Sequence, residues 1–253
     1  MDRFRLDGRA AVVTGGGGGI GSAGAVALAE AGADVAVVGR DLAKLRKTAR
    51  LIEAAGRRSL IVEADVTDEI SVCHAAGAVI DAFGKVDILF NNAGITSPKL
   101  LVDLSPPEWR RILEVNLTGS YLCSRAFAPG MIERRHGRII NMGSTLSGRG
   151  MATRTAYSAS KAGLANLGAA LAFELGPYGI TVNTIGATVI VTDLNRDLIE
   201  LQPELYEKVK KRTALGRLGK VDDVAGVLVF LSSPAAEFVT GQTIYVDGGF
   251  TAG

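Results

Sequence analysis

Short, mostly apolar runs alternate along the chain with longer segments that are alanine-rich or amphipathic. Short apolar runs are typical of strands buried on both faces of a parallel sheet, and the longer segments are typical of helices. The predicted strands are Ala10–Thr14, Asp34–Val38, Ser59–Glu63, Val86–Asn91, Arg138–Met142, Thr181–Ile185 and Thr243–Val246. The predicted helices are Ile20–Ala31, Asp41–Ala55, Ser71–Phe83, Pro106–Met131, Ala156–Leu175, a region around Asp193–Arg212, and Val221–Leu231.

This alternation decides the fold class. Right-handed crossovers between successive strands place them in a parallel sheet with helices on both faces. We therefore predict an α/β fold, a single Rossmann-type doubly wound sheet. The 253 residues suit one domain, because α/β folds often reach about 250 residues undivided. Asp41 is a candidate helix N-cap, and Gly32, Gly56 and Gly84 follow predicted helices as stop residues.

Composition and charge exclude several classes of protein. Apolar residues make up 47% of the chain, and its net charge is only +2, which argues against disorder and against nucleic acid as the main partner. Two cysteines 50 residues apart, Cys73 and Cys123, do not make a disulfide framework, and a reducing cytoplasm is expected. His74 and His136 lack metal-ligand spacing, so no metal site is predicted.

Residues 10–29 carry no charge and superficially resemble a membrane span or a signal peptide. However, seven of these 20 residues are glycine, and five of the glycines, Gly15 to Gly19, are consecutive. Each glycine inside a helix costs about 1 kcal/mol relative to alanine. The segment is better interpreted as a strand, a glycine loop and a helix, and neither a targeting segment nor membrane association is expected.

The ends of the predicted strands hold the candidate ligand-binding residues, because ligands bind beyond the carboxyl ends of such a sheet. A G-x-G-x-x-G pattern starts at Gly16 and again at Gly19, with a strand before it and a helix after it. These glycines allow the backbone to approach a pyrophosphate at a helix N-terminus. The second strand ends in Gly39-Arg40 rather than an acidic residue, and a guanidinium matches a 2′-phosphate. NADP is therefore the predicted cofactor, with NAD as the alternative.

The long helix after the fifth strand carries candidate catalytic residues. Tyr157 and Lys161 are four residues apart and share a helix face, and Ser144 ends the preceding strand. A lysine near a tyrosine favours the phenolate. Lowering the tyrosine pKa from about 10 to about 7 requires roughly 4 kcal/mol, which Lys161 and an oxidised nicotinamide would supply together. By spacing alone, such a pair is also common in ordinary surface packing.

Together these motifs resemble the short-chain dehydrogenase/reductase family over nearly the whole chain. Its T-G-x-x-x-G-x-G motif matches residues 14–21, its N-N-A-G motif matches residues 91–94, and residues 241–249 match its C-terminal segment. The resemblance implies the catalytic residues Asn116, Ser144, Tyr157 and Lys161. It implies a cofactor site formed by Thr14, Gly15, Gly17, Gly19, Ile20, Gly21, Gly39, Arg40, Asp65, Val66, Asn92, Ala93, Gly94, Tyr157, Lys161, Ile190 and Thr192.

The resemblance also implies a reaction. The nicotinamide exchanges hydride with a carbonyl or alcohol carbon, Tyr157 exchanges the proton and Ser144 holds the substrate oxygen. Lys161 binds the nicotinamide ribose, and Asn116 maintains helix geometry and a water in the proton relay. One departure is that Ala187-Thr188 replaces the usual Pro-Gly at the start of a variable lid of about residues 188–217. Either the loop tolerates this change, or activity or the pocket is altered.

The sequence leaves the substrate open. Some segments resemble gluconate-type sugar-acid dehydrogenases, and others resemble 3-oxoacyl-acyl-carrier-protein reductases, which dock the carrier with two arginines. Here Arg135 matches one arginine and Tyr178 replaces the other. A catalytically weak nucleotide-binding scaffold is the third alternative. The expected partners are a small carbonyl or alcohol substrate and further copies of the chain, in a homotetramer or homodimer.

Some candidate substrate contacts follow from position alone. Met151, Ala152 and Leu146 are expected to line the pocket, and Arg149 or Arg154 is expected to reach a carboxylate. The lid carries six cations that either attract an anionic substrate or form a solvated face: Arg196, Lys208, Lys210, Lys211, Arg212 and Arg217.

Overall fold

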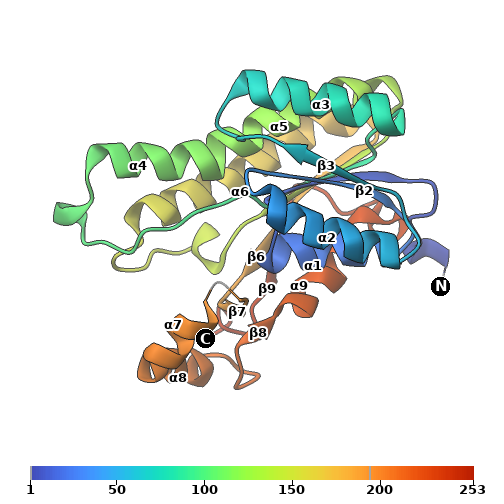
Figure 1. Cartoon of the computed structure of the whole chain (residues 1–253). Coiled ribbons are helices and arrows are strands. Elements are labelled where there is room, and N and C mark those ends of the chain that lie inside the picture. Colours follow the sequence, from blue (N-terminus) through green and yellow to red (C-terminus); the bar gives the residue numbers. More distant parts are fainter. Residues whose placement is uncertain (1, 194) are drawn as a thin grey trace.

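The computed structural model describes residues 2–193 and 195–253. Its centre is a seven-stranded parallel sheet with the strand order β3-β2-β1-β4-β5-β6-β9 (Figure 1). The strands are β1 (Ala10–Thr14), β2 (Asp34–Gly39), β3 (Ser59–Glu63), β4 (Ile88–Asn91), β5 (Gly137–Met142), β6 (Ile180–Ala187) and β9 (Thr243–Val246). The doubly wound α/β prediction is confirmed. The strand order reverses between β1 and β4, which is the switch point where such sheets bind ligands.

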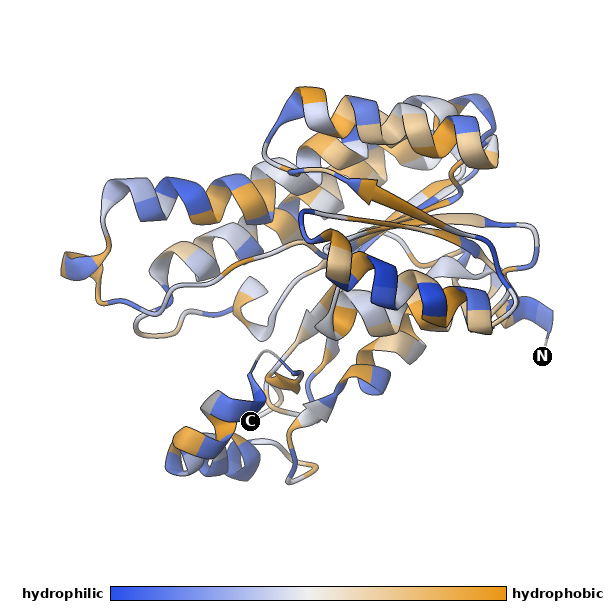
Figure 2. Ribbon diagram, in the orientation of Figure 1, coloured by the Kyte–Doolittle hydropathy of each residue, from blue (hydrophilic) through white to orange (hydrophobic). Residues whose placement is uncertain are grey.

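Helices cover both faces of the sheet (Figure 1). One face carries α1 (Gly19–Glu30), α2 (Leu42–Ala54) and α9 (Val221–Ser232). The other carries α3 (Glu69–Phe83), α5 (Gly119–Glu133) and α6 (Thr155–Leu175). Alternate residues of each strand enter opposite cores: Val13 packs under α1, and Val12 packs on the α3 side. Figure 2 shows the resulting apolar strands between helices with mixed surfaces.

The predicted helix ends are confirmed where a capping residue defines them. The Asp41 carboxylate accepts a hydrogen bond from the Lys44 backbone N–H at 3.1 Å, which caps the start of α2. Gly84 ends α3 in the left-handed region at φ +76°, and Gly56 follows α2 at φ +77°. Both positions strain a residue that has a side chain, so glycine determines where these helices stop.

The predicted single helix over Pro106–Met131 is wrong in one respect. It consists of α4 (Pro106–Leu113), a π-helical turn (Glu114–Thr118) and α5. The Gly119 N–H donates to the Glu114 carbonyl across this wider turn. The Ser120 hydroxyl donates to the Asn116 carbonyl at 3.2 Å and so competes for the regular backbone bond. Such π turns occur frequently at functional sites.

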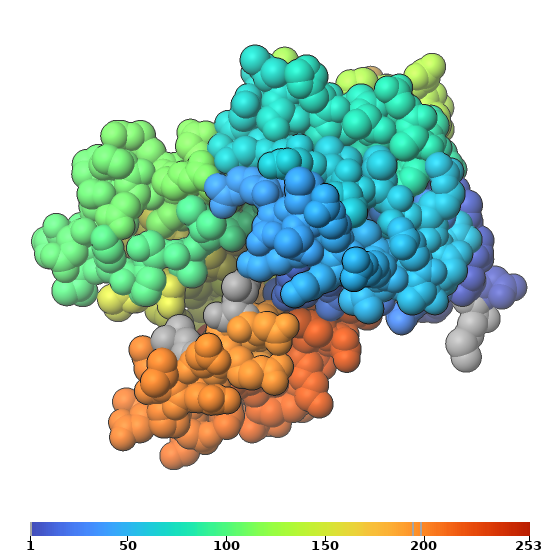
Figure 3. Space-filling view, viewed as in Figure 1, coloured from blue at the N-terminus to red at the C-terminus, as the bar shows by residue number. Residues whose placement is uncertain are grey.

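The predicted helical region Asp193–Arg212 is also divided. Its described part contains α7 (Arg196–Leu201) and α8 (Pro203–Arg212), and its residue 194 lies outside the described residues. Pro203 lacks an N–H and disfavours helical geometry at the residue before it, which ends α7. A small unpredicted sheet pairs β7 (Ile190–Val191) with β8 (Gly219–Lys220). These elements form a lobe below the main body in Figures 1 and 3.

Over the described residues, no helix combines the length and the apolar character that crossing a membrane requires.

Candidate active site

The glycine loop forms a cradle between β1 and α1. Gly15 and Gly19 have φ values of +63° and +52°, which favour glycine. A Cβ on Gly21 would lie 2.2 Å from the Gly15 carbonyl oxygen, so the helix and loop meet at backbone distance. Gly18 precedes α1 without any side chain that caps its N–H groups. The free N–H groups of this helix end suit a phosphate, so the residues fit a dinucleotide.

Thr14 fastens this loop to the neighbouring strand end. Its hydroxyl accepts hydrogen bonds from the backbone N–H groups of Asn92 and Ala93 at 3.0 and 3.1 Å. The Asn92 side chain donates back to the Thr14 carbonyl at 3.0 Å. Thr14 is buried, so in this structure it shapes the cradle and does not line its surface.

A cleft of about 660 Å³ runs from the glycine loop across the ends of β2 and β3; we call it the basic cleft. It brings together most of the predicted cofactor residues: Gly15, Gly17, Gly19, Gly39, Arg40, Asp65, Val66, Ala93 and Gly94. Sequence reasoning missed three further cations that line it, Lys44, Lys47 and Arg111. The position of Lys44 four residues after Arg40, in the first turn of α2, was a usable signal, whereas Arg111 belongs to the distant helix α4.

Asp65 lies among these cations. Arg40 Nη1 is 3.6 Å and Arg111 Nη2 is 3.7 Å from the same oxygen, Asp65 Oδ2. Burial raises the pKa of the Asp65 carboxyl, but hydrogen bonds from Thr67 and the charges of Arg111 and Arg40 outweigh burial and leave that pKa below its usual value. The carboxylate therefore stays charged and holds both guanidinium groups at the cleft.

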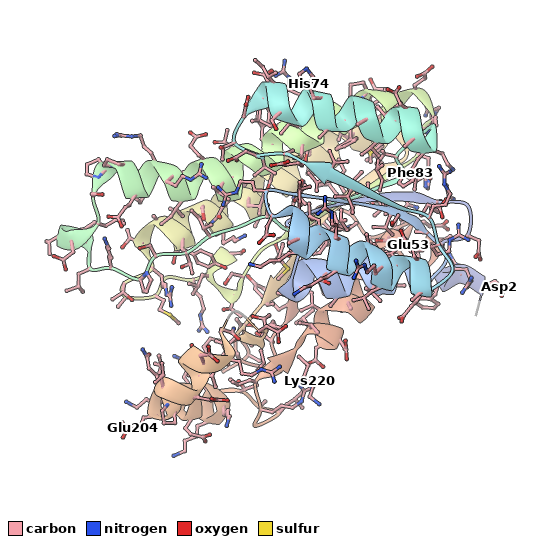
Figure 4. All side chains as sticks on the ribbon, viewed as in Figure 1. Asp2, Glu53, His74, Phe83, Glu204 and Lys220 are labelled. Carbon is pink, nitrogen blue, oxygen red and sulfur yellow. The ribbon has the colours of Figure 1, made fainter. Side chains whose placement is uncertain are left out.

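A second cleft of about 450 Å³, the tyrosine cleft, contains Ser144, Tyr157 and Lys161. It also includes the predicted cofactor residues Ile20, Asn92, Gly94, Ile190 and Thr192. Gly94 and Ile95 line both clefts, which therefore adjoin at the switch point of the sheet. Neither histidine lines either cleft, and His74 lies on the outer side of α3, away from the lid residue Glu204 (Figure 4).

Lys161 is 3% exposed, and its Nζ donates to the Met142 carbonyl at 2.6 Å. The same Nζ is 5.7 Å from the centre of the Tyr157 ring. Burial lowers the pKa of Lys161 to about 8. The predicted juxtaposition of the two side chains on one helix face is thus present.

The expected fall of the Tyr157 pKa is not found in this structure. Burial raises that pKa, and the neighbouring Ser144 hydroxyl and the Arg154 charge oppose the rise without reversing it. The Lys161 ammonium donates to the Met142 carbonyl, and burial disfavours its charged form. A phenolate at neutral pH therefore needs a further positive charge close to the ring.

Asn116 is fully buried in the π turn, and a Cβ on Gly94, which lines both clefts, would lie 3.4 Å from the Asn116 Oδ1. Its Oδ1 accepts from the Ile95 N–H at 2.8 Å, and its Nδ2 donates to the Ile95 carbonyl at 3.0 Å. The same Nδ2 donates to the Ser160 hydroxyl at 3.0 Å. Asn116 thereby ties the loop after β4 to α6, next to the catalytic tyrosine candidate.

The presence of Ala187-Thr188 in place of Pro-Gly does not strain the backbone where the lid follows β6. Ala187 stays in β6, and the positive-φ residues other than glycine in the described chain are Arg135 and Thr153, so Thr188 is not strained. Asn195, which sequence reasoning missed, donates to the Ile190 carbonyl and accepts from the Thr192 N–H, both at 2.8 Å. Thr192 lies close to Gly19, since a Cβ there would be 3.2 Å from its methyl group.

The substrate-side predictions are partly met. Leu146, Met151 and Arg154 line the tyrosine cleft, whereas Ala152 and Arg149 do not. Arg149 donates to the Phe250 carbonyl at 3.3 Å and lies over the Phe250 ring. Sequence reasoning missed Thr96, Tyr206, Val209 and Phe250, which also line the cleft.

None of the six lid cations lines the tyrosine cleft. Arg217 pairs with Asp223 at 2.7 Å, Arg196 pairs with Asp193 at 3.3 Å, and Lys210 pairs with Glu207. Arg212 lies 4.8 Å from the centre of the Phe250 ring. Their arrangement favours the interpretation as a solvated face.

Comparison with known proteins agrees with this geometry. A family model described as enoyl-(acyl carrier protein) reductase matches residues 15–251. The short-chain reductase protein NovJ of Streptomyces niveus is 38% identical and covers 94% of this chain and 92% of its own length. The chain therefore belongs to the short-chain dehydrogenase/reductase family, and it is an oxidoreductase.

Two further relatives bear on the chemistry. A crystal structure of a gluconate 5-dehydrogenase from Burkholderia cenocepacia J2315 in complex with NADP and tartrate has a TM-score of 0.95 and 38% identity. The match covers 100% of this chain and 98% of that one. The 3-oxoacyl-[acyl-carrier-protein] reductase FabG of Vibrio cholerae is 38% identical, with 97% of this chain and 98% of FabG covered.

Proposed function

We propose that this protein catalyses reversible hydride transfer between NADP(H) and a carbonyl or secondary alcohol substrate. The observation that carries this proposal is the junction of the two clefts at Gly94 and Ile95, where Ser144, Tyr157 and Lys161 face one space. A cofactor held in the basic cleft would extend toward these side chains, because the two clefts share Gly94 and Ile95. When bound, it supplies or accepts the hydride.

Four residues of the chain divide the remaining work. Tyr157 exchanges a proton with the substrate oxygen, acting as acid in reduction and as base in oxidation. Ser144 holds that oxygen by a hydrogen bond. Lys161 would hold the nicotinamide ribose, and the positive charge of an oxidised nicotinamide would supply the phenolate stabilisation that the lysine alone does not provide. Asn116 positions the loop after β4 and the start of α6.

The cations of the basic cleft support NADP rather than NAD. Four positive charges lie beside the strand end where NAD-dependent proteins usually have an acid that binds the ribose. They belong to Arg40, Lys44, Lys47 and Arg111. Asp41, Asp65 and Asp193 also line the cleft, and Asp41 pairs with Lys44 at 3.5 Å while Asp65 pairs with Arg40 and Arg111, so the lining side chains carry a net charge of +1. The relative from Burkholderia cenocepacia was crystallised with NADP. NAD is the alternative cofactor.

The substrate is a small ketone, polyol or sugar acid in this proposal. Similarity to a gluconate 5-dehydrogenase crystallised with tartrate supports the sugar acid. Reduction of a 3-oxoacyl group on an acyl carrier protein is the alternative, supported by the similarity to FabG. The Arg135 guanidinium, however, donates to the Pro177 carbonyl at 2.8 Å, and Tyr178 adds no second cation for an acidic carrier. A nucleotide-binding scaffold without turnover is the remaining alternative.

The organisation of the protein is part of the same proposal. Residues 1–253 form one dinucleotide-binding catalytic domain, with about residues 188–217 as its substrate lid. The protein works in the cytoplasm as a homotetramer or homodimer. Tyr121 on α5 and Phe173 on α6 have exposed aromatic side chains, which supports association through these two helices.

The test measures NADPH oxidation against a panel of ketones, sugar acids and carrier-bound 3-oxoacyl groups. Tyr157→Phe is expected to abolish turnover and to retain the affinity for NADPH, measured by fluorescence titration. Near-wild-type activity of this variant contradicts the catalytic assignment. Binding of NADPH by the wild type without turnover of any substrate favours the scaffold.

A further inference from the structure

The tyrosine cleft carries positive charge without a compensating acid. Among the described residues that line it, Arg154 and Lys161 are charged, and no aspartate or glutamate is present. Lys161 is buried against the Met142 carbonyl. Arg154 is therefore the cation available on the substrate side of the cleft. Within the described residues, no carboxylate lies within ion-pair distance of its guanidinium.

The backbone around Arg154 is held firmly in place. Its N–H donates to the Met151 carbonyl at 3.2 Å, and its carbonyl accepts from the Ser158 N–H at 2.7 Å in the first turn of α6. The preceding carbonyl, that of Thr153, accepts from the Lys99 N–H at 3.0 Å. The Arg154 side chain is itself directed, since its Nη1 donates to the Thr96 hydroxyl at 2.8 Å.

Thr153 is strained to achieve this arrangement. Its φ is +64°, a region that a β-branched residue adopts rarely. Such strain is found mostly at sites that use the resulting geometry. The unusual turn leads directly into α6, of which Arg154 is the N-cap residue, three positions before Tyr157. The side chains of Arg154 and Tyr157 line the same cleft.

We propose that Arg154 determines substrate specificity by binding a carboxylate of the substrate. This inference rests on the proposed function, because it assigns the substrate class of the same cleft. A planar guanidinium presents a fork that matches a carboxylate. Its position relative to Tyr157 selects oxo acids, and the corresponding hydroxy acids, in which a few carbon atoms separate the carboxylate from the reacting carbon.

The test compares a 4-oxo acid with its neutral ester. Levulinate and methyl levulinate carry the same ketone, and kcat/KM with NADPH is measured for both. The wild type is expected to prefer levulinate by at least about tenfold. Arg154→Gln is expected to lower kcat/KM for levulinate by about 10- to 100-fold and to change that for the ester by less than about threefold. Arg154→Lys is expected to retain part of the preference.

Arg149→Gln is the matched control. This arginine lies in the same loop but stacks on Phe250, so its loss is expected to affect acid and ester alike and to leave their ratio unchanged. Increasing salt is expected to weaken the preference for levulinate in the wild type but not in Arg154→Gln. An unchanged preference in Arg154→Gln, or its loss in Arg149→Gln instead, overturns the inference.

Calorimetry separates this inference from the proposed function. The affinity for levulinate and for tartrate is measured in the presence of oxidised cofactor, independently of turnover. Carboxylate binding that is lost in Arg154→Gln supports the inference even if no ketone is reduced, in which case the proposed function fails alone. Reduction of ketones by a wild type that binds neither carboxylate overturns the inference and leaves the proposed function intact. If the wild type shows neither carboxylate binding nor turnover, both the inference and the proposed function are overturned.

Discussion

Replacing Arg40 by aspartate is expected to reverse the cofactor preference. Arg40 is the residue of the basic cleft that directly follows β2, and its side chain is 64% exposed. Its Nη1 is 3.6 Å from Asp65 Oδ2, too far for a strong hydrogen bond. The guanidinium therefore has donors available for a 2′-phosphate, and little of the protein's stability depends on it.

The expected magnitude follows from the charge and the exposure. Hydrogen bonds to charged groups contribute about 1.5–3 kcal/mol, and the exposure of Arg40 places its contribution at the lower end of that range. Since 1.4 kcal/mol is a factor of ten, Arg40→Ala is expected to weaken NADPH binding about tenfold. Arg40→Asp adds repulsion of the phosphate, and about 100-fold is expected. Lys44, Lys47 and Arg111 remain, so binding is weakened and not abolished.

The assay measures kcat/KM for NADPH and NADH with one saturating ketone. Both variants are expected to lose activity with NADPH and to keep activity with NADH within about threefold, because NADH has no 2′-phosphate to lose. Arg50→Ala is the matched control, as Arg50 is exposed on the same helix, α2, but does not line the cleft. Equal losses with both cofactors refute the proposed phosphate contact, and so does a clear NADH preference in the wild type.

Two further predictions concern Lys161 and Asn195. Burial lowers the pKa of Lys161 to about 8 from 10.5, so the unfolded state binds more protons between these pH values and wild-type stability rises there with pH. Lys161→Met lacks this rise, so its free energy of unfolding, measured in urea titrations, is expected to fall behind that of the wild type by about 3 kcal/mol between pH 8 and pH 10.5. Parallel pH profiles of stability for the two proteins contradict this. Asn195→Ala removes both hydrogen bonds that fix Ile190 and Thr192, so it is expected to raise the KM for NADPH about tenfold. Asn195→Asp is expected to have an intermediate KM because it keeps one acceptor. An unchanged KM refutes the role of Asn195 in holding the lid at the cofactor site.

The sheet and most of its helices were predictable because their signals are local. A strand such as Ala10–Thr14 is apolar over its whole length, and α2 has a capping aspartate at one end and Gly56 after the other. The break inside Pro106–Met131 has no such local signal. It depends on Ser120 competing for a carbonyl and on Gly119 approaching Val66, where a Cβ would lie 2.8 Å from a methyl group. The division of the lid was readable, because Pro203 marks it.

The candidate site shows the same division between local and distant signals. Tyr157 and Lys161 are related by one helical turn, and Ser144 by its place at a strand end, so the sequence alone brings these three together. The electrostatic environment of these side chains cannot be predicted from their spacing. Whether Lys161 lowers the Tyr157 pKa depends on the Met142 carbonyl and on burial, which only the packed structure specifies.

The substrate side is the least predictable part, because its walls come from segments that are distant in sequence. Phe250 reaches the tyrosine cleft from the C-terminal tail, which Asp247 folds back by accepting hydrogen bonds from the N–H groups of Gly249 and Thr251. The guanidinium groups of Arg149 and Arg212 lie 5.5 and 4.8 Å from the centre of its ring. This stacking removes both arginines from competition for an anionic substrate. The sequence offered Arg149 and Arg154 equally, and the aromatic residue of the tail is what leaves Arg154 as the cation that faces the cleft.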